Sequence, residues 1–207
     1  MHRGIYFGIA AMAALIVASN VLVQFRFGDW LTLGAFTYPF AFLITDLTNR
    51  IFGPSAARKV VYSGFAIGAL CSAIGTQIML EHGPAVTYRI ALGSAIAFMT
   101  AQLIDVVVFD RLRKTAWWHA PLVSSLIGSA VDTALFFFIA FSTALTFIEP
   151  DNSVSWAAEL VPVLGTGPDA PLWISLAAAD FAVKVALALV ALVPMRFFSK
   201  LWRDAIA

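Results

Sequence analysis

Charge is scarce in this sequence. Only 12% of its 207 residues are Asp, Glu, Lys or Arg, while 61% are hydrophobic. A water-soluble domain carries about twice that charged fraction. The apolar residues gather in runs about 20 residues long, the length of helix that crosses a bilayer core about 30 Å thick. The composition therefore predicts an integral membrane protein in a lipid bilayer. Because the net charge of +1 has no basic patch behind it, we expect no nucleic-acid partner.

Residues that carry common catalytic chemistry are also few. The single cysteine, Cys71, excludes an intrachain disulfide and a cysteine metal cluster. The three histidines lie at the ends of apolar runs, and the sequence contains no GxxxxGK[ST], HExxH or GxSxG pattern. We therefore expect no enzyme activity, no metal site, no cofactor and no ATP binding by a P-loop.

Apolar segments long enough to form membrane-spanning helices are abundant in the sequence. We predict an all-α, polytopic membrane protein with a single transmembrane domain over residues 1–207. A proline in the second span, Pro39, predicts that this helix is kinked or interrupted, because proline has no backbone N–H. The six predicted spans cover about 4–24, 31–52, 60–80, 89–109, 121–148 and 172–195, with a longer loop at 149–171.

Lysine and arginine predict the orientation of these spans. Only Arg26 and Arg89 lie at one set of span ends. The opposite set has Arg3, Arg50, Arg58, Lys59, Arg111, Arg113, Lys114, Arg196, Lys200 and Arg203. Because positively charged loops remain in the cytoplasm, both termini are predicted to be cytoplasmic and the 149–171 loop to face outward.

Polar side chains inside the spans are the candidate functional site. A charge at the centre of a helix costs at least about 2.5 to 3.5 kcal/mol on insertion, so these groups should face the bundle interior or a wet cavity. At about 1.5 Å of rise per residue, the charges fall into a midplane tier and a cytoplasmic-side tier. The midplane tier has Asp132, Asp180 and Lys184, and the cytoplasmic-side tier has Asp46 and Asp105. The polar residues Asn49, Gln102, Ser125 and Thr133 lie nearby in the same spans and complete the candidate site.

Some of these charges could serve structure alone. Asp180 and Lys184 are four residues apart, which predicts an ion pair on one helix face. That pair either only neutralises itself or also meets a substrate. Asp105 could pair with Arg111 or Arg113 beyond the end of its span. Asp132 has no basic residue within a turn of its own helix, which favours a functional role.

Small residues in the first span allow close helix packing. The patterns Gly4xxxGly8 and Ala10xxxAla14 permit contact either within the chain or with another subunit. A homodimer is therefore possible.

Four sequence blocks resemble the queuosine precursor transporter family, also called the vitamin uptake transporter family, and its proteobacterial branch in particular. They are TYPFAFLITDLTNRIFG, QLIDVVVFDRLR, SSLIGSAVDTALFFFIAF and DFAVKVALALVALVPM. The resemblance implies a multi-pass importer of 7-deazaguanine bases in the bacterial inner membrane, working for tRNA queuosine salvage as a secondary transporter or facilitator. The chain departs from other branches at WWHAPL, where they carry an Arg-Asn pair. The alternative is a substrate-binding subunit of a multi-component ATP-driven importer.

The predicted substrate suits the polar residues. A guanine-like base offers a ring N–H and an amine that one carboxylate can accept together. It also offers a carbonyl to a donor such as Gln, Asn or Lys, and a flat face to Phe or Tyr. We expect Asp132, Asp180 and Lys184 to line a central site. The adjoining tier of Asp46, Asn49, Gln102 and Asp105 would contact the base or gate the cytoplasmic exit.

Overall fold

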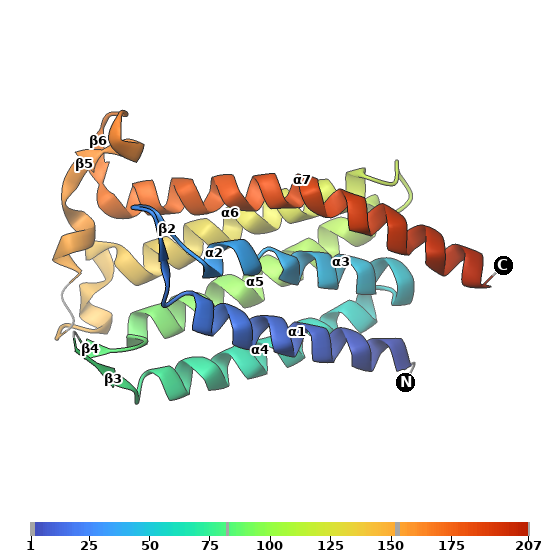
Figure 1. The fold of residues 1–207 in the computed structure, drawn as a ribbon, viewed down its shortest axis with the longest axis horizontal. Helices are drawn as coiled ribbons and strands as arrows, with labels where there is room; N and C mark the ends of the chain where they lie inside the picture. Colours follow the sequence, from blue (N-terminus) through green and yellow to red (C-terminus); the bar gives the residue numbers. More distant parts are fainter. Residues whose placement is uncertain (1–2, 82, 152–153, 207) are drawn as a thin grey trace.

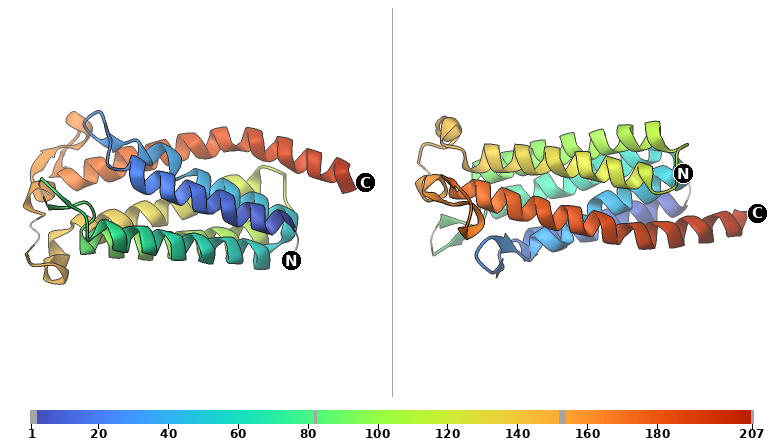
Figure 2. Two further views of the ribbon diagram at one scale, coloured as in Figure 1. Left: turned by 60° about the horizontal axis from the view of Figure 1, so that its bottom comes forward. Right: turned by 90° about the horizontal axis from the view of Figure 1, so that it is seen from above.

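The chain forms an elongated bundle of helices, with both termini at one end (Figures 1 and 2). The computed structural model describes residues 3–81, 83–151 and 154–206. Its α-helices are α1 (Arg3–Leu22), α2 (Gly34–Thr37), α3 (Phe40–Phe52), α4 (Pro54–Gly75), α5 (Tyr88–Leu112), α6 (His119–Phe141) and α7 (Leu172–Ile206). In the described part of the chain, α1, α4, α5, α6 and α7 contain stretches long and apolar enough to cross a membrane.

Short hairpins cover the end of the bundle opposite the termini (Figure 1). Each is an antiparallel pair: β1 (Arg26–Phe27) with β2 (Leu31–Thr32), β3 (Met79–Leu80) with β4 (Gly83–Pro84), and β5 (Leu160–Pro162) with β6 (Asp169–Pro171). The chain between α6 and α7 contains three short 3₁₀ helices: η1 (Thr143–Ile148), η2 (Ser155–Ala158) and η3 (Val163–Gly165). We call this the hairpin end and the opposite one the terminal end.

The second predicted span is interrupted, as Pro39 predicts. Residues Tyr38 and Pro39 separate α2 from α3. Just after the break, the N–H groups of Ala41 and Phe42 bond to carbonyls three residues back, at 3.0 and 3.1 Å, rather than four. The two pieces remain nearly in line, because Tyr38 and Pro39 keep helical backbone angles.

Several helix boundaries differ from the predicted ones. Helix α4 begins at Pro54 rather than near 60, because Gly53 adopts φ +84° and turns the chain directly into a helix with proline in its first turn. Helix α6 ends at Phe141 rather than near 148, where Ser142 becomes extended and η1 follows. Hydropathy places the start of α4 too late because Arg58 and Lys59 lie in its first turns, and it places the end of α6 too late because residues 143–148 are mostly apolar.

Glycine allows the helices to approach closely. A Cβ on Gly128 of α6 would lie 2.6 Å from the Phe42 ring of α3. On α1, a Cβ on Gly4 would lie only 2.3 Å from the Phe52 ring, so this face packs inside the chain. Ala10 and Ala14 are exposed on the same helix, and the possible homodimer remains a prediction.

Arg89 fastens α5 to the end of α6. Its side chain is fully buried, although the sequence marked it only as a charge at a span end. Its guanidinium donates to the Ile139 carbonyl at 2.9 and 3.1 Å and to the Ser142 carbonyl at 2.6 Å. These carbonyls belong to the last turn of a helix, where no further backbone N–H can reach them. Arg89 therefore acts as a cap for α6.

Candidate functional site

A cavity of about 580 Å³ lies inside the bundle and extends to the hairpin end. Trp30 of the β1–β2 turn and Trp156 of η2 contribute to its wall there. Deeper in the bundle, the same cavity is lined by Asp132, Asp180 and Lys184. Its volume lies within the range of about 300 to 1,000 Å³ that is usual for small-molecule sites.

The charged residues of the cavity form one compact cluster, which we call the central cluster. The Lys184 ammonium donates to Asp132 Oδ2 at 2.7 Å, to Asp180 Oδ2 at 2.5 Å and to Thr133 Oγ1 at 3.0 Å. The Thr133 hydroxyl in turn donates to Asp180 Oδ2 at 2.7 Å. The predicted Asp180–Lys184 ion pair is therefore confirmed. Asp132, which had no partner on its own helix, meets Lys184 across the α6–α7 interface.

The central cluster contains carboxylate oxygens that could accept hydrogen bonds from a ligand. All three N–H groups of Lys184 are used, and they reach only the Oδ2 oxygen of each aspartate. Among the described residues, no donor bonds to Oδ1 of Asp132 or Asp180. Two carboxylates against one ammonium also leave the cluster with a net negative charge. Such a site can accept hydrogen bonds from the N–H groups of a ligand.

Aromatic rings surround the cluster. The Tyr38 ring lies 5.9 Å from the Lys184 nitrogen, a distance typical of a cation–π contact. Tyr38 immediately precedes Pro39, so the helix break determines where this ring stands. The other rings on the cavity wall are those of Trp30, Phe65, Phe98, Phe136, Phe137, Phe141 and Trp156. A planar ligand would therefore find apolar faces beside the acceptor oxygens.

A second polar group lies nearer the terminal end, and we call it the inner cluster. Asp46 of α3 accepts from the Ser124 hydroxyl at 3.3 Å and from the Ser125 hydroxyl at 3.2 Å. Nearby, Gln102 Oε1 accepts from Thr45 at 2.6 Å. The Gln102 amide nitrogen is buried without a hydrogen-bond partner in the described structure.

Asp105 of α5 belongs to the inner cluster and has an unusual environment. Its side chain is fully buried, and neither carboxyl oxygen has a hydrogen-bond donor among the described residues. The Asp46 carboxyl is close enough to interact with it. The alternative that Asp105 pairs with Arg111 or Arg113 is not found among the described residues, and Arg113 instead bonds Asp110 at 3.3 Å. The chain continues in helix past Asp105, which carries Arg113 a full two turns away from it.

Contacts among arginines and aromatic rings hold the terminal end together. Arg113 also donates to the Asn49 carbonyl at 2.5 Å, which ties the α5–α6 connection to α3. Arg50 donates to the Trp117 carbonyl at 2.9 Å, and the Arg196 guanidinium of α7 lies 5.1 Å from the Trp117 ring. These contacts join α3, α7 and the α5–α6 connection at one place.

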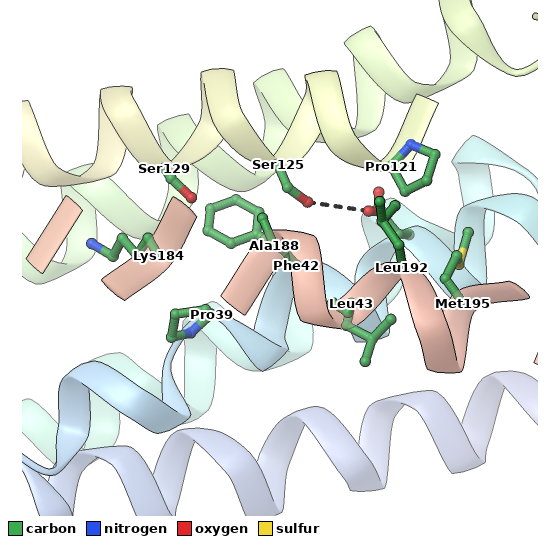
Figure 3. A pocket seen from close by; sticks show the side chains of 12 residues that line it. Pro39, Phe42, Leu43, Pro121, Ser125, Ser129, Lys184, Ala188, Leu192 and Met195 are labelled. Carbon is green, nitrogen blue, oxygen red and sulfur yellow. Dashed lines mark hydrogen bonds between the residues drawn. The ribbon is translucent and has the colours of Figure 1, made fainter. Parts of the chain in front are cut away.

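A narrow pocket of about 10 Å³ connects the two clusters, and Lys184 and Asp46 both line it. Figure 3 shows Lys184, Ser129, Phe42 and Ser125 in succession along it. A space of this size is near the minimum that holds one water molecule. The Phe42 ring and the small volume together exclude a planar base. In this structure, then, the ligand-sized space lies on the hairpin side of Lys184.

Eight of the nine predicted site residues separate into these two clusters. Asp132, Thr133, Asp180 and Lys184 meet in the central cluster, while Asp46, Gln102, Asp105 and Ser125 lie in the inner one. Asn49 instead donates to the Val106 carbonyl and accepts from Arg113 at the terminal end. Their roles in substrate binding remain predictions. Sequence reasoning missed Ser129 and Thr45. Only their position one turn from other polar residues signals them, since serine and threonine are common in apolar helices.

The chain is similar to known transporters. A family model described as putative vitamin uptake transporter matches residues 32–198. The queuosine precursor transporter of Escherichia coli (strain K12) is 35% identical over 198 residues, which cover 87% of this chain and 79% of that protein. A probable queuosine precursor transporter of Haemophilus influenzae is 37% identical over 169 residues, covering 69% of this chain and 71% of the relative. No solved structure matches the chain.

Proposed function

This chain belongs to the family of putative vitamin uptake transporters, and we propose that it imports queuosine precursors across the bacterial inner membrane. The relatives from Escherichia coli and Haemophilus influenzae carry the name queuosine precursor transporter. The substrates would be 7-deazaguanine bases. Because these relatives are named as transporters, the alternative of a binding subunit in an ATP-driven importer is not favoured.

We further propose six membrane crossings, with both termini in the cytoplasm. Helices α2 and α3 together would make the crossing that follows α1, since residues 34–52 rise about 28 Å at about 1.5 Å per residue. That is close to the thickness of a bilayer core. Both termini lie at one end of the bundle, which requires an even number of crossings. The excess of Lys and Arg at this end supports a cytoplasmic location.

The observation that carries the proposed binding mode is the central cluster on the wall of the 580 Å³ cavity. The Oδ1 oxygens of Asp132 and Asp180 would accept the ring N–H and the exocyclic amine of the base. Tyr38 and the phenylalanines of the cavity would cover its flat face. Such charge-assisted hydrogen bonds in a dry site are about twice as strong as neutral ones, which gives selectivity for an N–H-rich base.

Gln102 and Asn49 would act on the base after it has passed Lys184. The unpartnered amide nitrogen of Gln102 is a donor for the carbonyl of the base. The Asn49 amide donates to the Val106 carbonyl at 3.0 Å, and the Asn49 carbonyl accepts from Arg113. Because these contacts occupy Asn49, it would gate the exit rather than make the first contact with the substrate. Movement of the base between the clusters would require Phe42 to leave the narrow pocket.

Uptake of a labelled 7-deazaguanine base into a bacterial strain that depends on salvage tests this function. We expect the chain to restore uptake, and Asp132→Ala and Asp180→Ala to abolish it at normal membrane abundance. Asp110→Ala serves as a matched control, since that exposed carboxylate pairs only with Arg113. Normal uptake by both cluster variants would refute the proposed site.

A further inference from the structure

We propose that Asp46 and Asp105 form a proton-binding site, separate from the substrate cavity, and that import of the base is accompanied by entry of a proton. This inference rests on the proposed transport function. It assigns the energy source of that transport and a role to the inner cluster that substrate binding does not require.

Two buried carboxyl groups, those of Asp46 and Asp105, lie close together in the inner cluster. Asp46 is 2% exposed and Asp105 is 0% exposed, and the two side chains interact. Serine hydroxyls supply hydrogen bonds to Asp46, but the described residues give Asp105 none. Two ionised carboxylates in contact repel strongly in a dry site, so such pairs share a proton. A shared proton would also provide the missing hydrogen bond.

Among the described residues, no cation forms an ion pair with Asp46 or Asp105. From α7, Lys184 is occupied by Asp132 and Asp180. The other basic side chains on the helices around the pair bond other groups or are exposed. Arg50 of α3 bonds the Trp117 carbonyl, Arg113 after α5 bonds Asn49 and Asp110, and Arg196 of α7 lies over Trp117. The side chains of Arg58 and Lys59 on α4, Arg111 on α5 and Lys114 after it are exposed.

A route for a proton lies between the large cavity and this pair. The narrow pocket is lined by Lys184, which also lines the large cavity, and by Ser129, Ser125 and Asp46. Figure 3 shows Lys184, Ser129 and Ser125 in this order along it. Ser125 donates directly to Asp46 Oδ2 at 3.2 Å. Hydroxyls and one water can pass a proton through a space that excludes a base. A proton from the outer water would thus reach the pair while the terminal end is closed.

The proposed cycle needs no other reactant. A proton from the outer side adds to one carboxylate oxygen of the pair and is shared with the second carboxylate. When the contacts of Arg113 and Arg50 at the terminal end separate, water reaches the pair and the proton leaves to the cytoplasm. One base and one proton then enter in each cycle.

Purified full-length protein in liposomes tests this coupling with a labelled 7-deazaguanine base and a pH-sensitive dye inside. With acid outside, we expect accumulation of about tenfold per unit of pH difference, for one proton per base. The dye should record proton entry only after base is added. Asp46→Asn and Asp105→Asn should still exchange labelled base for unlabelled base, but lose both responses. Asp110→Asn, an exposed control, should keep both.

Infrared spectroscopy provides a measurement that does not depend on transport. A protonated buried carboxyl has a C=O stretching band distinct from that of a carboxylate, and we expect such a band at neutral pH in the unsubstituted protein. It should disappear in the double variant Asp46→Asn/Asp105→Asn, because a single variant leaves one buried carboxyl that can still hold the proton. Absence of the band, or accumulation by the unsubstituted protein that ignores the pH difference, would overturn the proton site while leaving transport intact. If the protein neither binds nor exchanges the base, the proposed function itself fails.

Discussion

Replacing Asp180 by asparagine is the most informative change to the central cluster. The substitution keeps the shape of the side chain and an oxygen that can accept from Thr133 and Lys184. It removes one negative charge, so that Lys184 remains paired with Asp132 alone. The cluster then changes from a net negative charge to neutrality. Any effect on binding therefore reports the charge of the site more than its packing.

The structure sets the expected magnitudes. Hydrogen bonds to charged groups contribute about 1.5 to 3 kcal/mol each, so losing the carboxylate should raise the Kd of a 7-deazaguanine base roughly 10- to 150-fold. The cost in unfolding free energy should be smaller than for Lys184→Met. That variant leaves Asp132 and Asp180 facing each other without a cation, and breaking a buried pair in this way costs about 3 to 5 kcal/mol.

Equilibrium binding of labelled base to the detergent-purified protein, followed by thermal unfolding of the same samples, measures both quantities. Asp110→Asn is the control, because its carboxylate is 41% exposed in its pair with Arg113. Exposed pairs contribute about 0 to 1 kcal/mol, so neither quantity should change much. If Asp180→Asn binds the base as tightly as the unsubstituted protein, the cavity acids do not recognise it and the reasoning is wrong.

Two further substitutions test how the helices are positioned. Gly128→Leu should lower the unfolding free energy by about 1 to 3 kcal/mol, because a Cβ there already meets the Phe42 ring at 2.6 Å. The control is Ala130→Leu, on the same helix with an exposed side chain. Equal stability of the two variants in thermal unfolding would contradict the prediction. Arg89→Met should lower the unfolding free energy by about 1 to 3 kcal/mol for each carbonyl left without a donor. It should leave uptake per folded molecule unchanged. Reduced uptake at normal abundance would mean that Arg89 acts on transport directly.

The two clusters could be predicted from sequence because depth along a helix is nearly linear in residue number. Asp132, Asp180 and Lys184 lie near the middle of their spans, and Asp46 and Asp105 lie nearer the terminal end. Spacing also revealed the Asp180–Lys184 pair, and Pro39 revealed the break between α2 and α3. Each of these inferences uses only contacts within one helix.

Contacts between helices could not be predicted in the same way. The sequence offered Asp105 an arginine at the end of its own span, but Asp46 from α3 meets it instead. The sequence indicated that Arg89 is a charge at the outer end of a span. Its burial could not be predicted because the Ile139 and Ser142 carbonyls that accept its hydrogen bonds lie at the end of another helix. Rotation of each helix about its axis decides such pairings. In a bundle that is apolar on nearly all sides, hydrophobic periodicity gives little information on that rotation.

The break at Pro39 gives a physical reason why the two clusters can affect each other. Tyr38, on the cavity side of the break, touches the central cluster through Lys184. Phe42 stands in the narrow pocket one turn later, and Asp46 follows after another turn, all on one continuous run of chain. A helix transmits displacement along its axis with little loss, whereas a proline break allows its two parts to tilt independently. A ligand that moves Tyr38 therefore acts at the hinge of α3, and tilting of α3 about this hinge shifts Phe42 and Asp46 together. Opening the path for the base and changing the surroundings of the Asp46–Asp105 pair would then be one movement, which is the requirement for import and proton release to occur in the same cycle.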